Sequence, residues 1–195
     1  MGLFRQVIIV SACLSVAAGA ASPAGAQTQQ QIDWCVDNGN TFSPDLRISG
    51  CTAAIQSGRW SGKDLAWAFN NRCRAYNDNN ETDRAIADCT DAIRLDPNYI
   101  AAYNNRGAEY QDKKDYDHAI ADFSAAIRLN PSFANAYHNR GNAYRDKKDY
   151  DRAIADDNEA IRLDPNYAGA YDNRGIAYRT KSDYDHGEAT RLQPH

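Results

Sequence analysis

The chain has 195 residues, of which 43% are hydrophobic, and a formal net charge of −4. This length suits one ordinary domain or a short array of repeats, and the hydrophobic fraction is enough for a buried core. Nucleic-acid binding calls for a clustered basic face, and the sequence contains no block of like charges, so we expect no nucleic-acid partner.

Residues 1–26 differ in composition from the rest of the chain. They carry one charge, Arg5, which is followed by an uncharged apolar run and by Ala24, Gly25 and Ala26. A positive start, a short apolar segment and an A-x-A exit are typical of a signal peptide. We therefore expect cleavage after Ala26 and a periplasmic or secreted protein. The run is shorter than the ~20 residues of a spanning helix, so we expect no membrane span after cleavage.

An alternative is a lipid anchor, because the stretch "VSAC" (10–13) resembles a lipobox that would place a lipid on Cys13. The apolar run before it looks too short for export. Removal of residues 1–26 takes away Arg5 and no acidic residue, which leaves 21 basic and 26 acidic residues and a net charge of −5. Four cysteines remain, and an oxidising compartment would allow them to form two disulfides.

Residues 27–65 look like a worn copy of a unit that recurs later in the chain. The stretch "SPDLRISGCTAAIQSG" (43–58) aligns with "DYDRAIADDNEAIRLD" (149–164), and the match includes the apolar residues Ile48, Ala54 and Ile55. About four extra residues near "RWSGKD" then separate this segment from the clearer units. We expect residues 27–65 to form a degenerate repeat-like segment.

From Ala66 onward the chain repeats itself every 34 residues. The stretches "RAIADCTDAIRLDPNY", "HAIADFSAAIRLNPSF" and "RAIADDNEAIRLDPNY" align without a gap. Within a unit, Tyr103, Gly107 and Tyr110 recur at helical spacing, a polar "DKKD" follows, and a second helical run ends before Pro131. Two short helices cannot bury their apolar faces alone, so we expect stacked helix pairs that form a solenoid.

These recurring residues resemble the tetratricopeptide repeat (TPR). The signature residues, counted from 66, 100, 134 and 168, are the fourth-position aromatics Phe69, Tyr103, Tyr137 and Tyr171, the eighth-position small residues Cys73, Gly107, Gly141 and Gly175, the eleventh-position aromatics Tyr76, Tyr110, Tyr144 and Tyr178, the alanines Ala85, Ala119 and Ala153, the alanines Ala92, Ala126 and Ala160, and the closing prolines Pro97, Pro131 and Pro165. The resemblance implies an all-α superhelix of αα-hairpins with about four and a half repeats. The expected units are 66–99, 100–133, 134–167 and a truncated 168–195.

Two departures from the pattern lead to further expectations. The last unit aligns only if five residues are dropped, so we expect a short, poorly packed or frayed end after about Lys181. The third unit has Asp157 where the second has Phe123. Asp157 is therefore expected either to be partly exposed or to have a cationic partner.

The register that the resemblance implies places the cysteines in pairs. Cys35 and Cys73 fall at the eighth position, where the two helices of a hairpin approach closely, and Cys51 and Cys89 fall at the twenty-fourth. We predict the disulfides Cys35–Cys51 and Cys73–Cys89. The alternative is that these cysteines are buried free thiols.

The seventh position carries arginine where the family usually has leucine. A half-buried arginine needs a counter-charge, and the second helix supplies an aspartate at the same period. The predicted pairs are Arg72–Asp88, Arg106–Asp122 and Arg140–Asp156. Arg174 has no such aspartate because of the five-residue loss. The alternative is that each arginine extends along its aliphatic stem to water.

The expected binding residues follow from the family's groove, which is lined by the first helix of each pair. Its sixth position is asparagine in every unit: Asn71, Asn105, Asn139 and Asn173. Side-chain amides donate and accept, so such a ladder is able to hold a peptide backbone. Other expected groove residues are Asn104, His138, Asn142 and Arg145, with Asn70, Arg74, Asn77, Gln111, Asp172 and Arg179. The alternative is that duplication copied the asparagines without a role. The family's carboxylate clamp is doubtful, because Lys113, Lys114, Lys147 and Lys148 fall in turns.

We find no catalytic or metal-binding pattern in the sequence. The histidines, His118, His138, His186 and His195, are far apart, and His118 and His186 share a repeat position that is arginine elsewhere. We therefore expect no cofactor, no metal and no enzyme activity. The expected function is a scaffold or adaptor that binds a protein or peptide in its groove. The alternative is a structural component that self-associates through its repeats, and an enzyme subunit is less favoured.

Overall fold

The computed structural model describes residues 23–36 and 41–191, with side chains over 29–36 and 41–182. In this part the chain is helical, without β-strands. The elements are α1 (Pro23–Val36), α2 (Pro44–Gln56), the short 3-10 helix η1 (Gly62–Leu65), α3 (Ala66–Asp78), α4 (Thr82–Leu95), α5 (Ile100–Asp112), α6 (Tyr116–Leu129), α7 (Ala134–Asp146), α8 (Tyr150–Leu163) and α9 (Ala168–Arg191).

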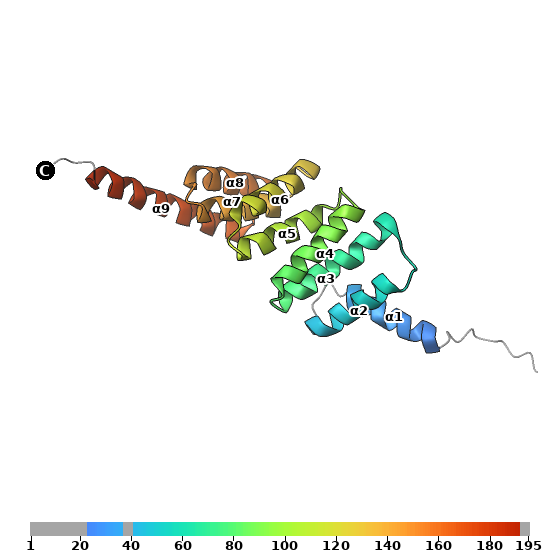
Figure 1. Cartoon of the computed structure of the whole chain (residues 1–195). Coiled ribbons are helices and arrows are strands. Elements are labelled where there is room, and N and C mark those ends of the chain that lie inside the picture. Colours follow the sequence, from blue (N-terminus) through green and yellow to red (C-terminus); the bar gives the residue numbers. More distant parts are fainter. Residues whose placement is uncertain (1–22, 37–40, 192–195) are drawn as a thin grey trace, which may run out of the picture.

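The helices pair in chain order. α1 packs on α2, α3 on α4, α5 on α6 and α7 on α8, and each hairpin also packs on the next one. Figure 1 shows the hairpins stacked along one direction, with α9 packed on α8 and extending away from the stack at the C-terminal end. Four hairpins and one unpaired helix match the predicted four and a half repeats, and the predicted all-α fold is confirmed.

Each hairpin of the regular units turns at a residue with positive φ. Asn80, Lys114 and Lys148 have φ values of 58°, 61° and 64°, a region that reverses the chain in one residue. The second helix then begins two residues later in each unit. Asp115 and Asp149 cap its first turn by accepting hydrogen bonds from backbone N–H groups three residues on.

The second helices end at an Asp-Pro or Asn-Pro pair. The residue before proline is extended, as at Asp96 with φ −132° and ψ 94°, because the helical region is disfavoured there. Its side chain accepts a hydrogen bond from the backbone N–H two residues on, which fixes the turn into the next repeat. These bonds join Asn98 to Asp96, Ser132 to Asn130 and Asn166 to Asp164.

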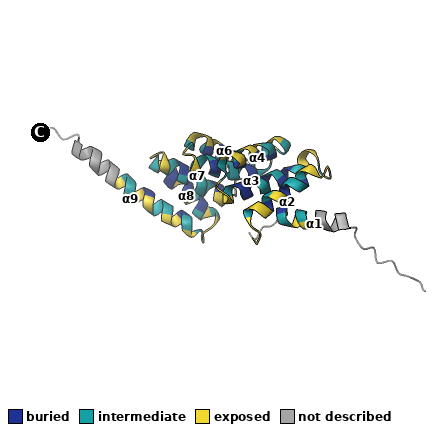
Figure 2. Ribbon diagram, turned by 60° about the horizontal axis from the view of Figure 1, so that its bottom comes forward, coloured by how far each residue is buried: buried dark blue, intermediate teal, exposed yellow. Residues whose placement is uncertain are grey.

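Small residues set the distance between helices. Ala85, Ala119 and Ala153 are fully buried, as the family pattern requires. At Gly107 an added Cβ would lie 2.7 Å from the ring of Phe123, which is itself fully buried. Figure 2 shows that buried positions occur in each of the stacked helices that it labels from α2 to α8. The core is therefore a seam between helices that is made largely of alanine and consists of four clusters in the described part.

The segment before the regular units is also a hairpin. In α2, an added Cβ at Gly50 would lie 2.4 Å from the backbone oxygen of Gln31, so α1 and α2 approach closely at this point. Cleavage after Ala26 would fall within the first turn of α1. Residues 1–22, which include Cys13, lie outside the described residues. Among the described helices none is both long and apolar enough to span a bilayer.

We expected a short, poorly packed or frayed end after about Lys181, and the end is not short. The side chains after Ser182 lie outside the described residues, so the packing of this end stays a prediction. α9 continues as one helix to Arg191, through the position where the other units turn. Ser182 is helical, whereas Lys148, its equivalent one repeat earlier, has positive φ. The five missing residues correspond to 153–157, which in the third unit include the closely packed Ala153 and the ion-paired Asp156. Without them a second helix has too little apolar surface to fold back, so the first helix continues.

Candidate functional site

The arginines of the first helices bind the aspartates of the second helices. The structure brings together all three expected pairs, with Nε–Oδ2 distances of 2.6 Å for Arg72–Asp88, 2.7 Å for Arg106–Asp122 and 2.8 Å for Arg140–Asp156. Each guanidinium also donates from Nη2 to the second carboxylate oxygen, at 2.7–2.9 Å. The bond to the aspartate raises the pKa of Arg106 and of Arg140 above its usual value.

The same arginines also reach backwards to the preceding hairpin. Nη1 of Arg106 donates to Thr90 Oγ1 and Nη1 of Arg140 donates to Ser124 Oγ, each at 3.0 Å. Arg72 makes the corresponding bond to Thr52, and Arg174 to Asn158. Each arginine therefore links two hairpins, and its position inside the stack is explained by structure and not by ligand binding.

The turn lysines are likewise engaged in contacts between repeats. Lys113 Nζ lies 2.6 Å from Asp83 Oδ1, and Lys147 pairs with Asp117 in the same way one repeat later. Both pairs are largely exposed. Lys113 and Lys147 follow directly on α5 and α7, so each lysine joins the end of a first helix to the second helix of the previous unit.

The asparagine ladder runs along the first helices. Asn105 Nδ2 donates to Asn70 Oδ1 at 2.9 Å, and Asn139 Nδ2 donates to Asn104 Oδ1 at 3.0 Å. The amide nitrogens thus join neighbouring repeats. The amide oxygens of Asn105 and Asn139 accept no hydrogen bond from the described residues, so these two oxygens remain available to a ligand.

The third and fourth units share a polar network that includes four expected groove residues. With Nδ1 protonated, His138 donates to Asp157 Oδ1 at 3.2 Å, and its Nε2 accepts from Asn142 at 3.2 Å. Asn142 Oδ1 accepts from Asn173 at 2.6 Å, and Asn173 Oδ1 accepts from Arg145 at 2.8 Å. These four side chains hydrogen-bond within the network, which the sequence did not predict.

Asp157 fits neither of its two expected cases, because it is buried and its partner His138 has Nε2 as an acceptor in the tautomer described above. Its residue exposure is 1%, and His138 is its partner. Burial raises the pKa of the Asp157 carboxyl, and the hydrogen bond from His138 opposes that rise. His118, by contrast, is exposed and contacts Asp115, which fits a solvated helix position. The side chains of His186 and His195 lie outside the described residues.

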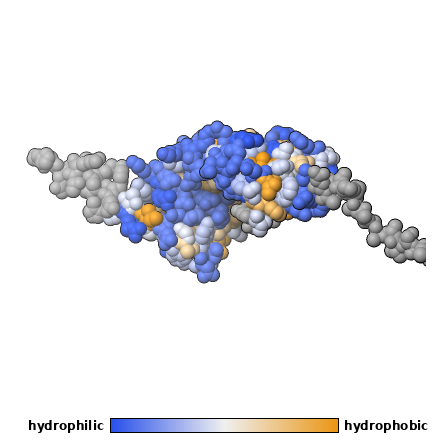
Figure 3. All heavy atoms as spheres, turned by 90° about the horizontal axis from the view of Figure 1, so that it is seen from below, coloured by the Kyte–Doolittle hydropathy of each residue, from blue (hydrophilic) through white to orange (hydrophobic). Residues whose placement is uncertain are grey.

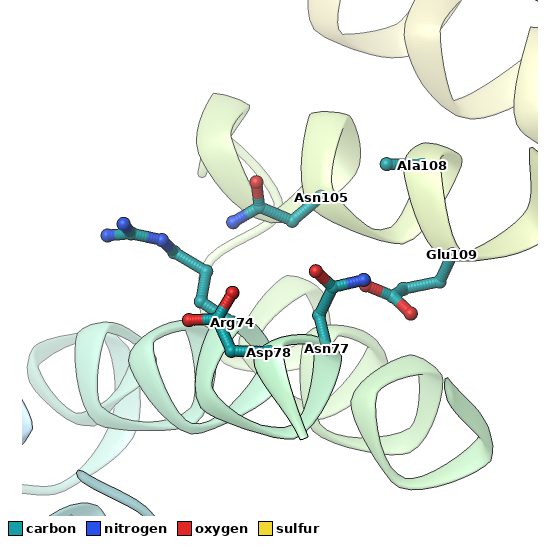
Figure 4. Close-up of a pocket in the computed structure, with 6 residues that line it drawn as sticks. All are labelled: Arg74, Asn77, Asp78, Asn105, Ala108 and Glu109. Carbon is teal, nitrogen blue, oxygen red and sulfur yellow. The ribbon is translucent and has the colours of Figure 1, made fainter. Parts of the chain in front are cut away.

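A small cavity of about 140 Å³ opens between α3 and α5. Figure 4 shows Arg74, Asn77 and Asp78 projecting from α3 toward Asn105 and Glu109 on α5. Arg74 has no ion-pair partner among the described residues, whereas Asp78 pairs with Arg47 of α2. The cavity is therefore lined by a guanidinium without an ion-pair partner in the described part and by the side-chain amide of Asn105.

Glu109 is a feature of this cavity that sequence reasoning missed. It is 2% exposed, and one carboxyl oxygen has no hydrogen-bond partner in the described structure. Burial raises its pKa to about 7, against a hydrogen bond from Asn77, and Asp112 and Asp78 raise it further. A signal was present, because the residues at its repeat position in the other units are alanines: Ala75, Ala143 and Ala177.

The hollow surface around such sites is polar. Figure 3 shows a face that is hollowed near its centre and predominantly hydrophilic there. Amides and charged side chains on α3, α5 and α7 supply this character at the cavity and in the network around His138. A surface of this kind suits hydrogen bonding to a peptide and offers little to an apolar ligand.

The four cysteines form the two expected pairs. Cys35 and Cys51 have an S–S distance of 2.09 Å, and Cys73 and Cys89 one of 2.06 Å. Each bridge joins the two helices of one hairpin. In α1 and α2 the bridge lies beside Gly50 and Trp34, at the positions that carry the aspartate and the arginine in the later units. The α1–α2 hairpin therefore lacks the arginine–aspartate pair, and the disulfide Cys35–Cys51 cross-links its two helices instead.

The described residues offer no group of three or more His, Cys, Asp or Glu side chains that is able to hold a metal ion. Glu109 is the buried acid with the most strongly raised pKa in this cavity, which also contains the carboxylate of Asp78. The arrangement is one of hydrogen-bond donors and acceptors for binding.

Comparison with known proteins agrees with this architecture. Tetratricopeptide repeat models match residues 68–99, 100–133 and 123–155, and a TPR repeat model matches 141–181. No curated protein matches the chain. The models together span the regular units and the first part of α9.

Solved structures show the same fold. A crystal structure of MamA is 23% identical and has a TM-score of 0.68, covering 83% of this chain and 86% of its own. The MamA RS-1 ArsTM double mutant is 20% identical, also with a TM-score of 0.68, and covers 85% of this chain and 89% of its own. The first TPR of Spaghetti (RPAP3), bound to an HSP90 peptide, is 25% identical with a TM-score of 0.59, covering 60% of this chain and 93% of its own. The repeat models, the stacked hairpins and the seam of small residues agree, and this chain belongs to the tetratricopeptide repeat family.

Proposed function

We propose that this chain is a non-catalytic binding protein that holds an extended peptide segment of a partner along α3, α5 and α7. The proposal rests on the asparagine ladder at Asn105 and Asn139, in which the amide nitrogens are hydrogen-bonded and the amide oxygens are not, among the described residues. The amide nitrogens of Asn105 and Asn139 bind the preceding repeat, which orients the side chains, while their oxygens have no partner in the described structure. Oriented acceptors one repeat apart suit the N–H groups of an extended backbone.

The cavity beside Asn105 adds a charge preference. Arg74 is half-buried and without an ion-pair partner in the described part, and it lies where a ligand over Asn105 would pass. We propose that an acidic side chain of the peptide pairs with Arg74. The lysines are bound to Asp83 and Asp117, so this differs from a clamp built on turn lysines. RPAP3, which shares the fold, has been solved with an HSP90 peptide, so a TPR of this size is able to hold a peptide.

We also propose that the protein works in an oxidising compartment, the periplasm or the outside of the cell. Two cysteine pairs at bonding distance support this, together with the signal-like composition of residues 1–26. Cleavage after Ala26 would leave both pairs in the mature chain.

The test is selection from a random peptide display library, followed by affinity measurement on purified variants. Selected peptides should bind Asn105→Ala/Asn139→Ala at least about tenfold more weakly, because two hydrogen bonds are lost. The matched control is Asn98→Ala/Asn166→Ala, two exposed asparagines in the loops between repeats, and it should bind as wild type does. Thermal unfolding of each variant checks that the fold is retained. Failure to select any peptide, or equal affinity for the ladder variant, would contradict the proposal.

A further inference from the structure

In the regular hairpins one face of the first helix is covered by the second helix. On α5 this face consists of Tyr103, Arg106, Gly107 and Tyr110, and α6 lies on it. The ring of Phe123 packs on Gly107, and Asp122 binds the guanidinium of Arg106 at 2.7 Å. The same contact recurs on α3 and α7, where Asp88 and Asp156 take the place of Asp122.

α9 carries the same face without the covering helix. Its residues are Tyr171, Arg174, Gly175 and Tyr178, which match the four on α5. Tyr171 and Tyr178 are 43% and 55% exposed, and an added Cβ at Gly175 would meet nothing within 4 Å. Figure 2 shows exposed residues along the described part of α9. This face is open because α9 runs straight through the position of the missing turn.

Arg174 lies on the open face without the aspartate that binds the equivalent arginine in the complete units. Its guanidinium still donates to Asn158 of the preceding hairpin at 2.7 Å, which holds it in the same place as the other three arginines. No carboxylate among the described side chains pairs with it. A fixed guanidinium beside an unfilled glycine position therefore leaves room for a carboxylate and an apolar residue from outside this part of the chain.

We propose that the open face of α9 docks an amphipathic helix of a partner protein, one that carries a small residue, a carboxylate three positions later and an apolar residue next to it. These features are taken from α4, α6 and α8, the helices that cover the equivalent face of α3, α5 and α7. They share Ala-x-x-Asp, as Ala119 and Asp122 show in α6. Docking would be stabilised by the burial of Tyr171 and Tyr178 and by the ion pair with Arg174.

A second folded copy of this chain is not the proposed occupant. The three helices with the Ala-x-x-Asp pattern already lie inside their own hairpins, and Asp88, Asp122 and Asp156 are each engaged by an arginine. A second copy could offer one of them only by opening a hairpin. A helix that is free in its own protein meets the requirement without that cost.

The chain supplies the probe for the test. A capped synthetic peptide with the sequence of residues 115–131, DYDHAIADFSAAIRLNP, should bind the full-length protein, as followed by fluorescence anisotropy of the labelled peptide. The same peptide with Asp122→Asn should bind at least about tenfold more weakly, since a charge-assisted pair is lost. In the protein, Arg174→Gln should weaken binding equally and should make the two peptides equivalent, which is the signature of a direct contact.

Two further variants locate the site. Gly175→Phe should abolish binding without unfolding the protein, because the added ring meets open space in the free chain but blocks the docked helix. Arg94→Gln removes the same charge from an exposed position on α4, a helix that does not pack on α9, and should leave binding unchanged.

Four results would overturn the proposal. They are the absence of binding, equal affinity of the two peptides for the wild-type protein, binding that survives Gly175→Phe, and a wild-type dimer that Gly175→Phe converts to a monomer. If the peptide still binds the Gly175→Phe variant, it binds elsewhere, by displacing the second helix of a hairpin. The dimer, measured by light scattering, would mean that a second copy covers the face. The variant Asn105→Ala/Asn139→Ala should bind the probe as wild type does, so the result is independent of the peptide groove.

Discussion

Asp122 receives two hydrogen bonds from one guanidinium, from Nε of Arg106 at 2.7 Å and from Nη2 at 2.8 Å. Both side chains are largely buried, and the pair recurs in each complete hairpin of the regular units. Breaking a buried pair on one side leaves an uncompensated charge, which costs more than the pair contributes when intact.

We therefore expect Arg106→Gln to lower the free energy of unfolding by about 2–4 kcal/mol in urea denaturation. Arg174→Gln is the matched control. Because Arg174 has no aspartate partner in the described part and loses only its bond to Asn158, we expect a change below about 1 kcal/mol. The double variant Arg106→Gln/Asp122→Asn should recover part of the loss. Equal effects of the two single variants would contradict the structural role given to the pair.

The cysteine pairs should be disulfides in the native protein. We expect the mass of the purified mature protein to rise by four hydrogen atoms on reduction, as measured by intact-protein mass spectrometry. Each bridge spans a separation of 16 residues, so its loss by Cys→Ala replacement should cost about 3 kcal/mol of unfolding free energy. Replacing Cys73 and Cys89 together should leave the other bridge in place. An unchanged mass would mean that the cysteines are buried thiols.

Glu109 should make stability depend on pH in an unusual direction for a carboxyl group. Burial raises its pKa from 4.5 to about 7 in the folded protein, so the unfolded chain releases this proton at lower pH than the folded one does. Its contribution to stability is therefore complete below about pH 4.5 and declines as pH rises through 7. We expect Glu109→Gln to be more stable than wild type by on the order of 3 kcal/mol at pH 8, with the difference vanishing below pH 4.5. Parallel stability curves for the two proteins across this range would show that Glu109 does not titrate as described.

Two glycines at the same repeat position should respond oppositely to alanine. An added Cβ at Gly107 would lie 2.7 Å from the buried ring of Phe123, so we expect Gly107→Ala to destabilise by about 1–3 kcal/mol. At Gly175 the Cβ meets open space, so Gly175→Ala should stabilise α9 by up to about 1 kcal/mol through its helix propensity. Thermal unfolding of both variants measures the contrast. The same sign for both would mean that the face of α9 is covered in solution.

Periodic features could be predicted from the sequence, and solitary ones could not. The pairing of Arg106 with Asp122 was predictable because both residues recur at the same interval, so that one hairpin explains them all. Arg47 and Glu109 each occur once, and their surroundings come from a neighbouring repeat whose distance the sequence does not state. The Arg47–Asp78 pair and the raised pKa of Glu109 were therefore found only in the structure.

The 34-residue recurrence was sufficient to predict helix pairs, their stacking and the small residues between them, because one helical register buries Ala119, Ala126 and their counterparts in the other complete units. Two matters depended on the folded chain. The amide nitrogens of the asparagine ladder bind Asn70 and Asn104 and leave the oxygens of Asn105 and Asn139 without a partner, a direction set by contacts between repeats. α9 continues where a turn was expected, because the choice between turning and continuing depends on whether the returning helix finds enough apolar surface to bury.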